Sequence, residues 1–304
     1  HEAERMALGL PELRTGASGD ASAPDAANTD EANVGTLPVP PLFAAPAQQS
    51  RAGWPARRAE LVPLVEDHWV GRVPDAVAGW RIAWLKRPLP DGREHWIGQV
   101  IGADGAMGPS VDALITLPAR AAGPLPALVD FTYVWPSGSP PAFPGPPAPA
   151  NVDVATARGW AHVAYRPQLL QPDDAQYMRW GVIGLARWPR AATDWGALRA
   201  WAWGASALRE ELARDPRLAA EQISLAGHSR FGKAVLVAAA FDHGFADALV
   251  SSSGAGGAKL MRRDFGERWE NLASPATFHW FAPALMRYAA GARTVADLPV
   301  DAHM

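Results

Sequence analysis

A strand, a tight turn and a helix follow one another without a linker at residues 223–241, and this junction constrains the fold more than any other segment. The apolar run 223–226 leads into Gly-His-Ser-Arg-Phe-Gly at residues 227–232, and an Ala/Val-rich helix is expected over 231–241. A serine at such a turn is lifted above the edge of a sheet. Because the strand and helix backbones nearly collide there, Gly227 and Gly232 have a steric purpose.

The residues around Ser229 give this turn a chemical character. Ser229 is expected at the amino end of a helix, where unpaired N–H groups and the helix dipole favour an oxyanion. The second glycine comes one residue later than in the common G-x-S-x-G pattern, and a Gly-x-Ser turn alone also fits an α/β protein of another function. Arg230 and Lys233 have no packing purpose at a tight turn. Two cations there suit a negatively charged substrate derived from a carboxylate.

The wider pattern predicts an α/β protein. Strands are expected at residues 80–85, 95–102, 111–117, 127–134, 160–165, 223–226 and 248–251. Helices are expected at residues 54–70 and 154–158, and a further helix, capped by Asp194, is expected to end before Pro216. This alternation predicts a mainly parallel sheet with helices on both faces, a three-layer sandwich like that of α/β-hydrolases. Only one strand follows the Ser229 turn, so the C-terminal strands of that fold are expected to be missing.

Composition limits the class of protein. The 304 residues are 48% hydrophobic with a net charge of −3, which gives no indication of a nucleic-acid or anionic-membrane partner. No apolar run approaches the ~20 residues of a membrane span. Residues 1–36 lack periodicity and are expected to form a disordered leader, followed by an incomplete catalytic domain over 37–304. The fourteen tryptophans suit core packing, although carbohydrate-handling proteins also stack sugars on such rings.

The sequence Gly-His-Ser-Arg-Phe-Gly-Lys at residues 227–233 resembles the corresponding motif of glucuronoyl esterases, a carbohydrate esterase family of the α/β-hydrolase superfamily, and is most similar to its bacterial branch. The late glycine followed by lysine makes this motif specific. Further similar segments are Asp-Trp-Gly at 194–196, Trp-Ala-Trp at 201–203, 253–258, 262–267, 279–281 and 298–303. The resemblance is loose over residues 54–304 and good over 193–304.

The resemblance implies a secreted or periplasmic serine esterase without cofactor or metal. Its substrate would be the ester between (4-O-methyl-)glucuronic acid of xylan and lignin alcohols, and no nucleic acid or membrane partner is expected. By the same resemblance Ser229 is the nucleophile, and Arg230 is a donor to the oxyanion. Lys233 and Glu267 would bind hydroxyls of the uronate ring. For Glu267 an alternative stays open, a surface ion pair with Arg263 four residues away.

Two departures from the family pattern lead to a further expectation. Ser252 stands where many members carry the acid of the triad, and none of the eight histidines falls where the family places its base. Asp301 and His303 match a structural pair of the family. We therefore expect a truncated and inactive esterase. The alternatives are an acetyl-xylan or other carboxylesterase of the same fold, and a non-catalytic, carbohydrate-binding degenerate hydrolase.

Overall fold

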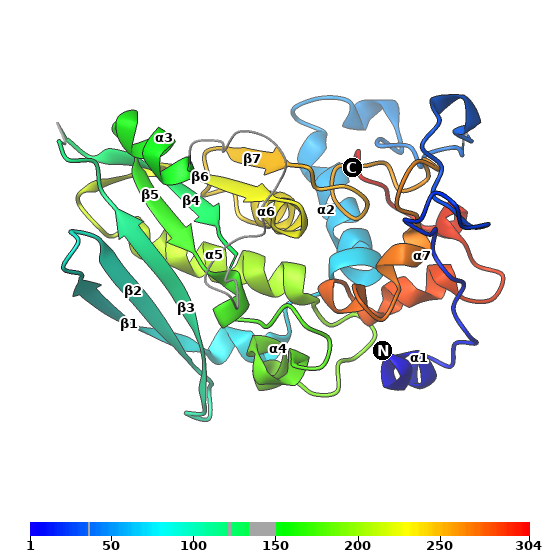
Figure 1. Cartoon of the computed structure of the whole chain (residues 1–304), viewed down its shortest axis with the longest axis horizontal. Helices are drawn as coiled ribbons and strands as arrows, with labels where there is room; N and C mark the ends of the chain where they lie inside the picture. The colour runs from blue at the N-terminus through cyan, green and yellow to red at the C-terminus, as the bar shows by residue number, and fades with distance from the viewer. Residues whose placement is uncertain (36, 121–122, 134–149) are drawn as a thin grey trace.

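The computed structural model describes residues 1–35, 37–120, 123–133 and 150–304, and a single mixed sheet organises them (Figure 1). The strand order among these residues is β1-β2-β3-β5-β4-β6-β7. The strands are β1 (Arg81–Pro88), β2 (Glu94–Ile101), β3 (Met107–Thr116), β4 (Leu125–Phe131), β5 (Ala161–Tyr165), β6 (Leu218–His228) and β7 (Ala248–Ser251). Each strand overlaps a range expected from the sequence.

The sheet has an antiparallel half and a parallel half. The pairs β1–β2, β2–β3 and β3–β5 are antiparallel, whereas β5–β4, β4–β6 and β6–β7 are parallel. Two antiparallel steps separate β2 from β5, so β2 also runs in the direction of the parallel strands. Five of the seven described strands therefore share one direction, which confirms the mostly parallel α/β fold.

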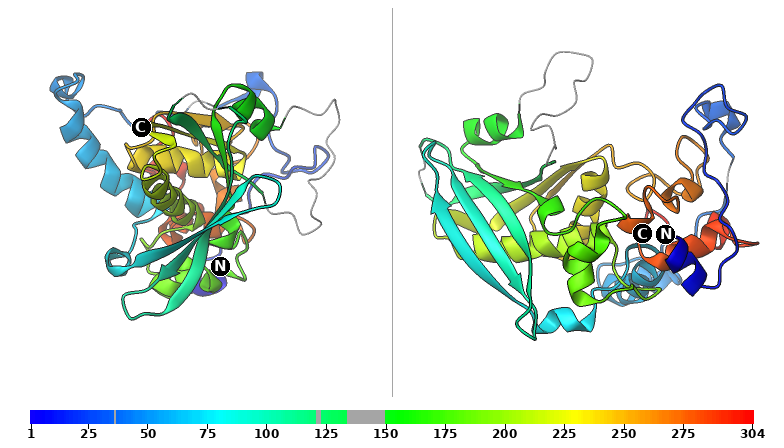
Figure 2. Two further views of the ribbon diagram at one scale, coloured as in Figure 1. Left: turned by 90° about the vertical axis from the view of Figure 1, so that its left-hand side faces the viewer. Right: turned by 60° about the horizontal axis from the view of Figure 1, so that its bottom comes forward.

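Helices cover both faces of this sheet. Figure 2 shows α5 (Ala197–Leu212) and α6 (Arg230–Phe241) on one face and α3 (Asn151–Ala157) towards the other. The remaining α-helices are α1 (Glu2–Ala7), α2 (Trp54–Val65), α4 (Val182–Ala186) and α7 (Trp269–Leu272). A π turn over Glu66–Val70 continues α2, and short 3-10 turns lie at Glu31–Asn33, Pro46–Gln48, Asp75–Gly79, Pro167–Leu169, Met178–Trp180, Phe278–Trp280, Pro283–Ala289 and Val295–Asp297.

The start of α5 differs from the expectation. Asp194 does not cap it; the residue before the helix is Gly196, which makes no side-chain cap, and the Asp194 carboxylate accepts a hydrogen bond from the Ala191 N–H instead. A Cβ at Gly196 would lie 2.2 Å from the Trp280 carbonyl oxygen. The helix therefore begins where two backbones touch, and only glycine fits that contact.

The tryptophan-rich stretch of α5 is core only in part. Trp195, just before the helix, and Trp201 have no solvent exposure, and the Trp201 N–H donates to the Gln171 carbonyl at 2.8 Å. Trp203 stays partly exposed. The core packing that the sequence suggests for the tryptophans is thus confirmed for two of these three rings.

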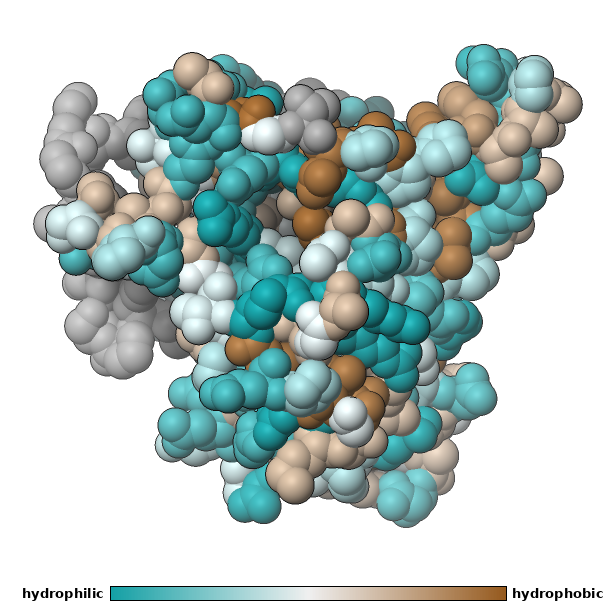
Figure 3. Space-filling view, turned by 90° about the vertical axis from the view of Figure 1, so that its right-hand side faces the viewer, coloured by the Kyte–Doolittle hydropathy of each residue, from teal (hydrophilic) through white to brown (hydrophobic). Residues whose placement is uncertain are grey.

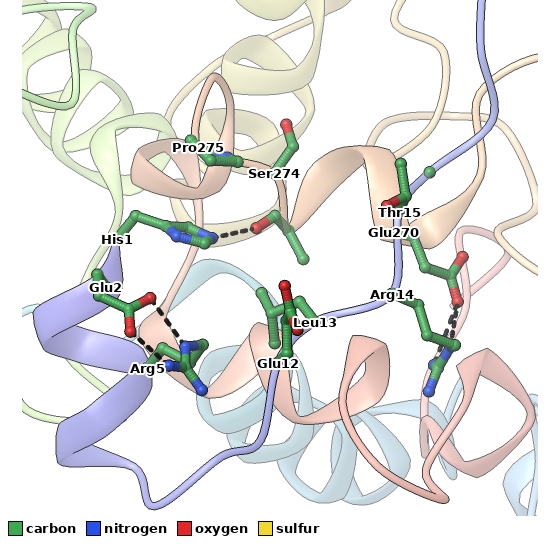
Figure 4. Close-up of a pocket in the computed structure, with 12 residues that line it drawn as sticks. His1, Glu2, Arg5, Glu12, Leu13, Arg14, Thr15, Glu270, Ser274 and Pro275 are labelled. Atoms are coloured by element: carbon green, nitrogen blue, oxygen red, sulfur yellow. Dashed lines mark hydrogen bonds and ion pairs between the residues drawn. The ribbon is translucent and has the colours of Figure 1, made fainter.

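The N-terminal segment lies against the body of the protein, in contrast to the predicted disordered leader over 1–36. The Glu4 carboxylate bonds the fully buried Arg190 guanidinium at 2.7 and 2.8 Å, because a charge without water needs an opposite charge. Figure 4 shows further contacts of the same segment, the His1 ring on the Ala273 carbonyl and Arg14 on Glu270. An isolated bridge joins Leu13 to Ala290.

The C-terminal segment is fixed by a buried ion pair. Arg262 bonds the Asp301 carboxylate at 3.0 Å, and both side chains are at most 4% exposed. The same guanidinium donates to the carbonyls of Val300, Leu298 and Ala296. Figure 3 looks onto the end of the molecule that carries both termini, where apolar residues form small groups among hydrophilic ones.

Candidate active site

The turn between β6 and α6 holds Ser229 in a strained conformation. Its backbone angles are φ 57° and ψ −125°, a region that costs a non-glycine residue on the order of 1–3 kcal/mol. The Ser229 N–H donates to the Ser251 carbonyl of β7 at 2.9 Å, and its own carbonyl accepts from Lys233 N at 3.1 Å. These bonds fix a partly buried serine at the start of a helix whose first N–H groups have no intrahelical acceptor.

The two glycines of the motif are required by different contacts. A Cβ at Gly227 would lie 2.6 Å from the Phe231 carbonyl oxygen, which is the strand-to-helix collision expected from the sequence. A Cβ at Gly232 would lie 2.8 Å from the Ser251 carbonyl oxygen. The late glycine therefore serves the approach of α6 to β7, and this accounts for its position outside the common spacing.

Arg230 extends from the first turn of α6 into a group of aromatic and acidic side chains. Its Nη1 donates to Asp173 Oδ2 at 2.6 Å, and its guanidinium carbon lies 5.1 Å from the Trp280 ring centroid. Its side chain is 39% exposed, yet the buried Nε has no acceptor among the described residues. Arg230 thus combines an anchor on Asp173 with a side chain that stays partly open to solvent.

Asp173 is a site residue that the sequence did not indicate. Its side chain is 3% exposed, and its Oδ1 accepts from Trp280 Nε1 at 2.7 Å and contacts His279 Nε2 at 3.2 Å. Burial would raise the pKa of this carboxyl, but the bonds from His279, Arg230 and Trp280 outweigh it and hold the pKa below its usual value. Asp173 lies in a loop without periodicity, so no sequence pattern could have identified it.

Lys233 lies one helical turn beyond Ser229 and is 5% exposed. Its Nζ donates to the Ser253 carbonyl at 2.5 Å and lies 5.8 Å from the Trp280 ring centroid. Burial lowers the pKa of the ammonium group, and the negative charge of Glu267 opposes this effect. Trp280, 9% exposed, therefore borders both cations of the motif as well as filling the core.

Glu267 approaches Lys233 across a glycine. Gly254 has φ 58°, and a Cβ there would lie 3.2 Å from Glu267 Oε2 and 3.8 Å from Lys233 Nζ. Both charged groups thus lie within 4 Å of one point. The alternative partner of Glu267, Arg263, pairs with Glu31 in the structure.

Tyr133 is a second site residue that sequence reasoning missed. Its hydroxyl donates to the His228 carbonyl at 3.0 Å, and its ring centroid lies 4.3 Å from that of Phe231. Burial raises the pKa of the phenol. The prolines at residues 136–149 suggest, from the sequence alone, either the rim of a site or a passive surface connector, and this stretch lies outside the described residues.

The described part of the chain places no histidine ring in a hydrogen bond with the Ser229 hydroxyl. His228 Nδ1 contacts Ser251 Oγ at 3.1 Å, and the buried His279 contacts Asp173. His303 contacts the Pro40 carbonyl, while Asp301 is held by Arg262. The pair Asp301 and His303 thus serves the packing of the C-terminal segment.

The position where many relatives are expected to carry the triad acid is an exposed turn here. Ser252 follows β7 with φ 46°. Its hydroxyl cannot stabilise an imidazolium as a carboxylate does. In the residues the structure describes, no group of three or more His, Cys, Asp or Glu side chains could hold a metal ion.

Comparison with known proteins identifies relatives of this arrangement. The sequence model described as "Glucuronyl esterase, fungi" matches residues 103–304. A 4-O-methyl-glucuronoyl methylesterase of Neurospora crassa is 25% identical over 301 residues, 92% of this chain and 66% of the relative. A carbohydrate esterase of an unknown prokaryotic organism is 39% identical over 114 residues, 36% of this chain and 25% of that protein.

Solved structures give the same result for the fold. A CE15 glucuronoyl esterase from Teredinibacter turnerae superposes with a TM-score of 0.84 at 35% identity, covering 100% of this chain and 77% of that one. A glucuronoyl esterase from Solibacter usitatus gives 0.74 at 28% identity, covering 90% and 77%. The chain therefore spans about three quarters of these structures, and between a quarter and two thirds of the two relatives compared by sequence.

Proposed function

Since the chain belongs to the glucuronoyl esterase family, we propose that it acts on esters of glucuronic acid, with Ser229 as the nucleophile. The observation that carries this proposal is the conformation of Ser229, strained between β6 and α6 and flanked by two cations. Strain of this kind persists where the surrounding structure over-determines it, which is common at active sites. The substrate class we propose is the ester between glucuronoxylan and lignin alcohols.

In the proposed reaction a general base takes the proton of the Ser229 hydroxyl as its Oγ attacks the ester carbonyl carbon, which forms a tetrahedral oxyanion, and the same proton later passes to the leaving alcohol. Arg230, anchored by Asp173, supplies a cationic donor beside that oxyanion, and the helix N-terminus adds a partial positive charge. Collapse of the intermediate expels the alcohol, which takes up a proton. Water then hydrolyses the acyl-enzyme and releases glucuronate.

The remaining charges favour a sugar acid over a neutral acyl group. Lys233 and Glu267 offer a donor and an acceptor side by side, which is suited to adjacent hydroxyls of a uronate ring. An acetyl group would leave these charges without a partner. We therefore place acetyl-xylan hydrolysis second, and the two substrates distinguish the proposals directly.

The general base determines how the proposal is tested, because no described histidine contacts the Ser229 hydroxyl. We expect little turnover of benzyl glucuronate by the 304-residue chain alone. Added imidazole should act as an external base and raise the rate. The measurement is alcohol release at increasing imidazole, with Ser229→Ala giving the background rate.

The rate of alcohol release by Ser229→Ala distinguishes the outcomes. Imidazole-dependent release that disappears in Ser229→Ala supports a serine esterase, and preference for the glucuronate ester over acetylated xylan supports the substrate class. Equal rates in both proteins would reject Ser229 as nucleophile and favour a degenerate hydrolase that only binds carbohydrate. Fast turnover without imidazole would show that a base is present after all.

A plant cell-wall substrate places the proposed activity outside the cytoplasm. We propose a secreted or periplasmic location on that ground. No helix among the described residues has the length and apolar character needed to cross a bilayer.

A further inference from the structure

A groove lined by tryptophans lies between α5 and β1, at the opposite end of the sheet from the Ser229 turn. Its volume is about 530 Å³. β1 contributes Ile82 and Trp84 to it, with Trp80 just ahead of the strand, and α5 contributes Trp203 and Glu210. β1 is the outermost strand in the order, whereas Ser229 lies between β6 and α6 near the other end (Figure 1).

The spacing of these residues makes the groove a continuous track. Trp80, Ile82 and Trp84 are two residues apart, so they share one face of β1 over about 13 Å. Trp203 and Glu210 are two helical turns apart and face the groove from the same side of α5. The ion pair between Lys86 and Glu211, at 2.8 Å, ties the strand to the helix nearby.

The tryptophan rings are held in fixed positions. The centroid of Trp80 lies 5.7 Å from that of Trp203 in an edge-to-face contact, and both rings pack on the fully buried Trp195. Trp84 lies against Gly98 of β2, where a Cβ would come within 2.9 Å of the far edge of its ring. A platform that is already ordered loses little entropy when a ligand binds.

The groove also offers unused polar groups. The indole N–H groups of Trp80, Trp84 and Trp203 have no acceptor within the described ranges, and the Glu210 carboxylate has no cationic partner there. Arg214, the other charged lining residue, is paired with Glu211 at 2.9 Å. One acid and one base leave the groove without a strong net charge, which disfavours an ionic ligand.

We propose that this groove binds a run of uncharged pyranose units of a polysaccharide, at a distance from the active site. Flat indole faces suit the apolar C–H face of a pyranose, while indole N–H groups and a carboxylate suit its hydroxyls. The inference goes beyond the proposed function and uses it only to choose the probe, soluble glucuronoxylan. Binding there would hold the enzyme on its polymer.

The test is affinity electrophoresis of the full chain in gels with and without glucuronoxylan. We expect wild-type migration to be retarded, and we expect Trp84→Ala to weaken binding about tenfold or more, the size of a lost aromatic contact. Leu85→Ala is the matched control, because Leu85 is the next residue on β1, points to the opposite face and is 44% exposed. It should bind as the wild type does.

A second variant guards against a folding defect in Trp84→Ala. Ala207→Gln fills the groove from α5 without removing any packed ring, and it should also abolish retardation. A wild type that is not retarded, or full retardation of both groove variants, would overturn the proposal. A dimer that forms in the wild type and is lost in Trp84→Ala, measured by sedimentation, would also overturn it, because a second copy of the chain would then occupy the groove. Ester hydrolysis through Ser229 is read in a separate assay, so failure of one proposal does not imply failure of the other.

Discussion

Two arginine–aspartate pairs, Arg262 with Asp301 and Arg230 with Asp173, use the same chemistry for different ends. The Arg262 side chain is 4% exposed, and its guanidinium bonds a carboxylate and three backbone carbonyls. The Arg230 side chain is 39% exposed and donates from Nη1 to Asp173. In both arginines the buried Nε has no acceptor among the described residues. Asp173 and Asp301, in contrast, are equally well buried.

The difference indicates how a cation is kept ready for a ligand. A buried charge that bonds a carboxylate and several backbone carbonyls stabilises the packing of its segment and is closed to a ligand. Arg230 is oriented by Asp173, and its larger exposed fraction leaves part of the guanidinium open to solvent. Residue type and burial of the acid do not separate the two cases; the exposed fraction of the arginine side chain does.

The largest effect is expected from Asp301→Ala. Removing the acid leaves the Arg262 charge buried without a partner, which should cost about 3–5 kcal/mol of unfolding free energy. Urea denaturation measures it. The matched control is Asp264→Ala, which breaks a pair with Arg268 that is 41% exposed on both sides and should cost at most about 1 kcal/mol. Equal losses would mean that burial does not distinguish these pairs.

Arg230→Met should affect rate and leave stability nearly unchanged. In the imidazole-supported assay we expect a fall of about 10²–10³-fold, as for the loss of one oxyanion donor. The melting temperature should shift little, because Trp280 and His279 still bond the buried Asp173 carboxylate after the arginine is replaced. A large loss of stability with an unchanged rate would show that Arg230, like Arg262, supports the packing of the protein and does not act on the substrate.

Asp173→Asn tests whether the acid positions Arg230. The amide cannot accept all three donors, so the guanidinium should lose its orientation and the rate should fall about tenfold at unchanged KM. The pKa of Asp173 is lower in the folded than in the unfolded protein. Its ionised carboxylate therefore stabilises the fold above the unfolded-state pKa, and this stabilisation is lost as the pH falls through the folded-state pKa. The variant should lack this part of the loss of stability in acid. An unchanged rate would restrict Asp173 to packing.

Lys233→Met should show the smallest change, with opposite signs for binding and stability. Burial lowers the pKa of Lys233 in the folded protein below 10.5. The charged ammonium group therefore destabilises the fold at pH values below that folded pKa, and this destabilisation decreases as the pH rises through it. The variant should melt no lower than the wild type near neutral pH, while glucuronate binding weakens. Calorimetry measures both quantities, and a clear loss of stability would show that the ammonium supports the fold.

The sequence was sufficient where local patterns determine structure. β7 begins and ends as expected, and the collisions at Gly227 and Gly232 follow from a strand that turns directly into a helix. Apolar runs between turn residues set these elements, and they depend on neighbours in the chain. The glucuronoyl esterase resemblance likewise rested on contiguous residues.

Contacts between distant segments could not be predicted in this way. Asp173 reaches Arg230 across 57 residues and Trp280 across 107 residues, from a loop that carries no periodic signal. Glu4 reaches Arg190 across 186 residues, so a segment of disordered composition lies against the body. The positions of these acids depend on the complete tertiary fold, which local patterns in a single sequence do not specify.

The contact between Glu4 and Arg190 has a practical consequence for preparing the protein. The Glu4 carboxylate neutralises a guanidinium that has no solvent exposure. A proteolytic cut or a truncation that removes Glu4 would therefore leave the Arg190 cation in the interior without its opposite charge, and the segment that carries Glu4 should be kept when the protein is shortened for crystallisation.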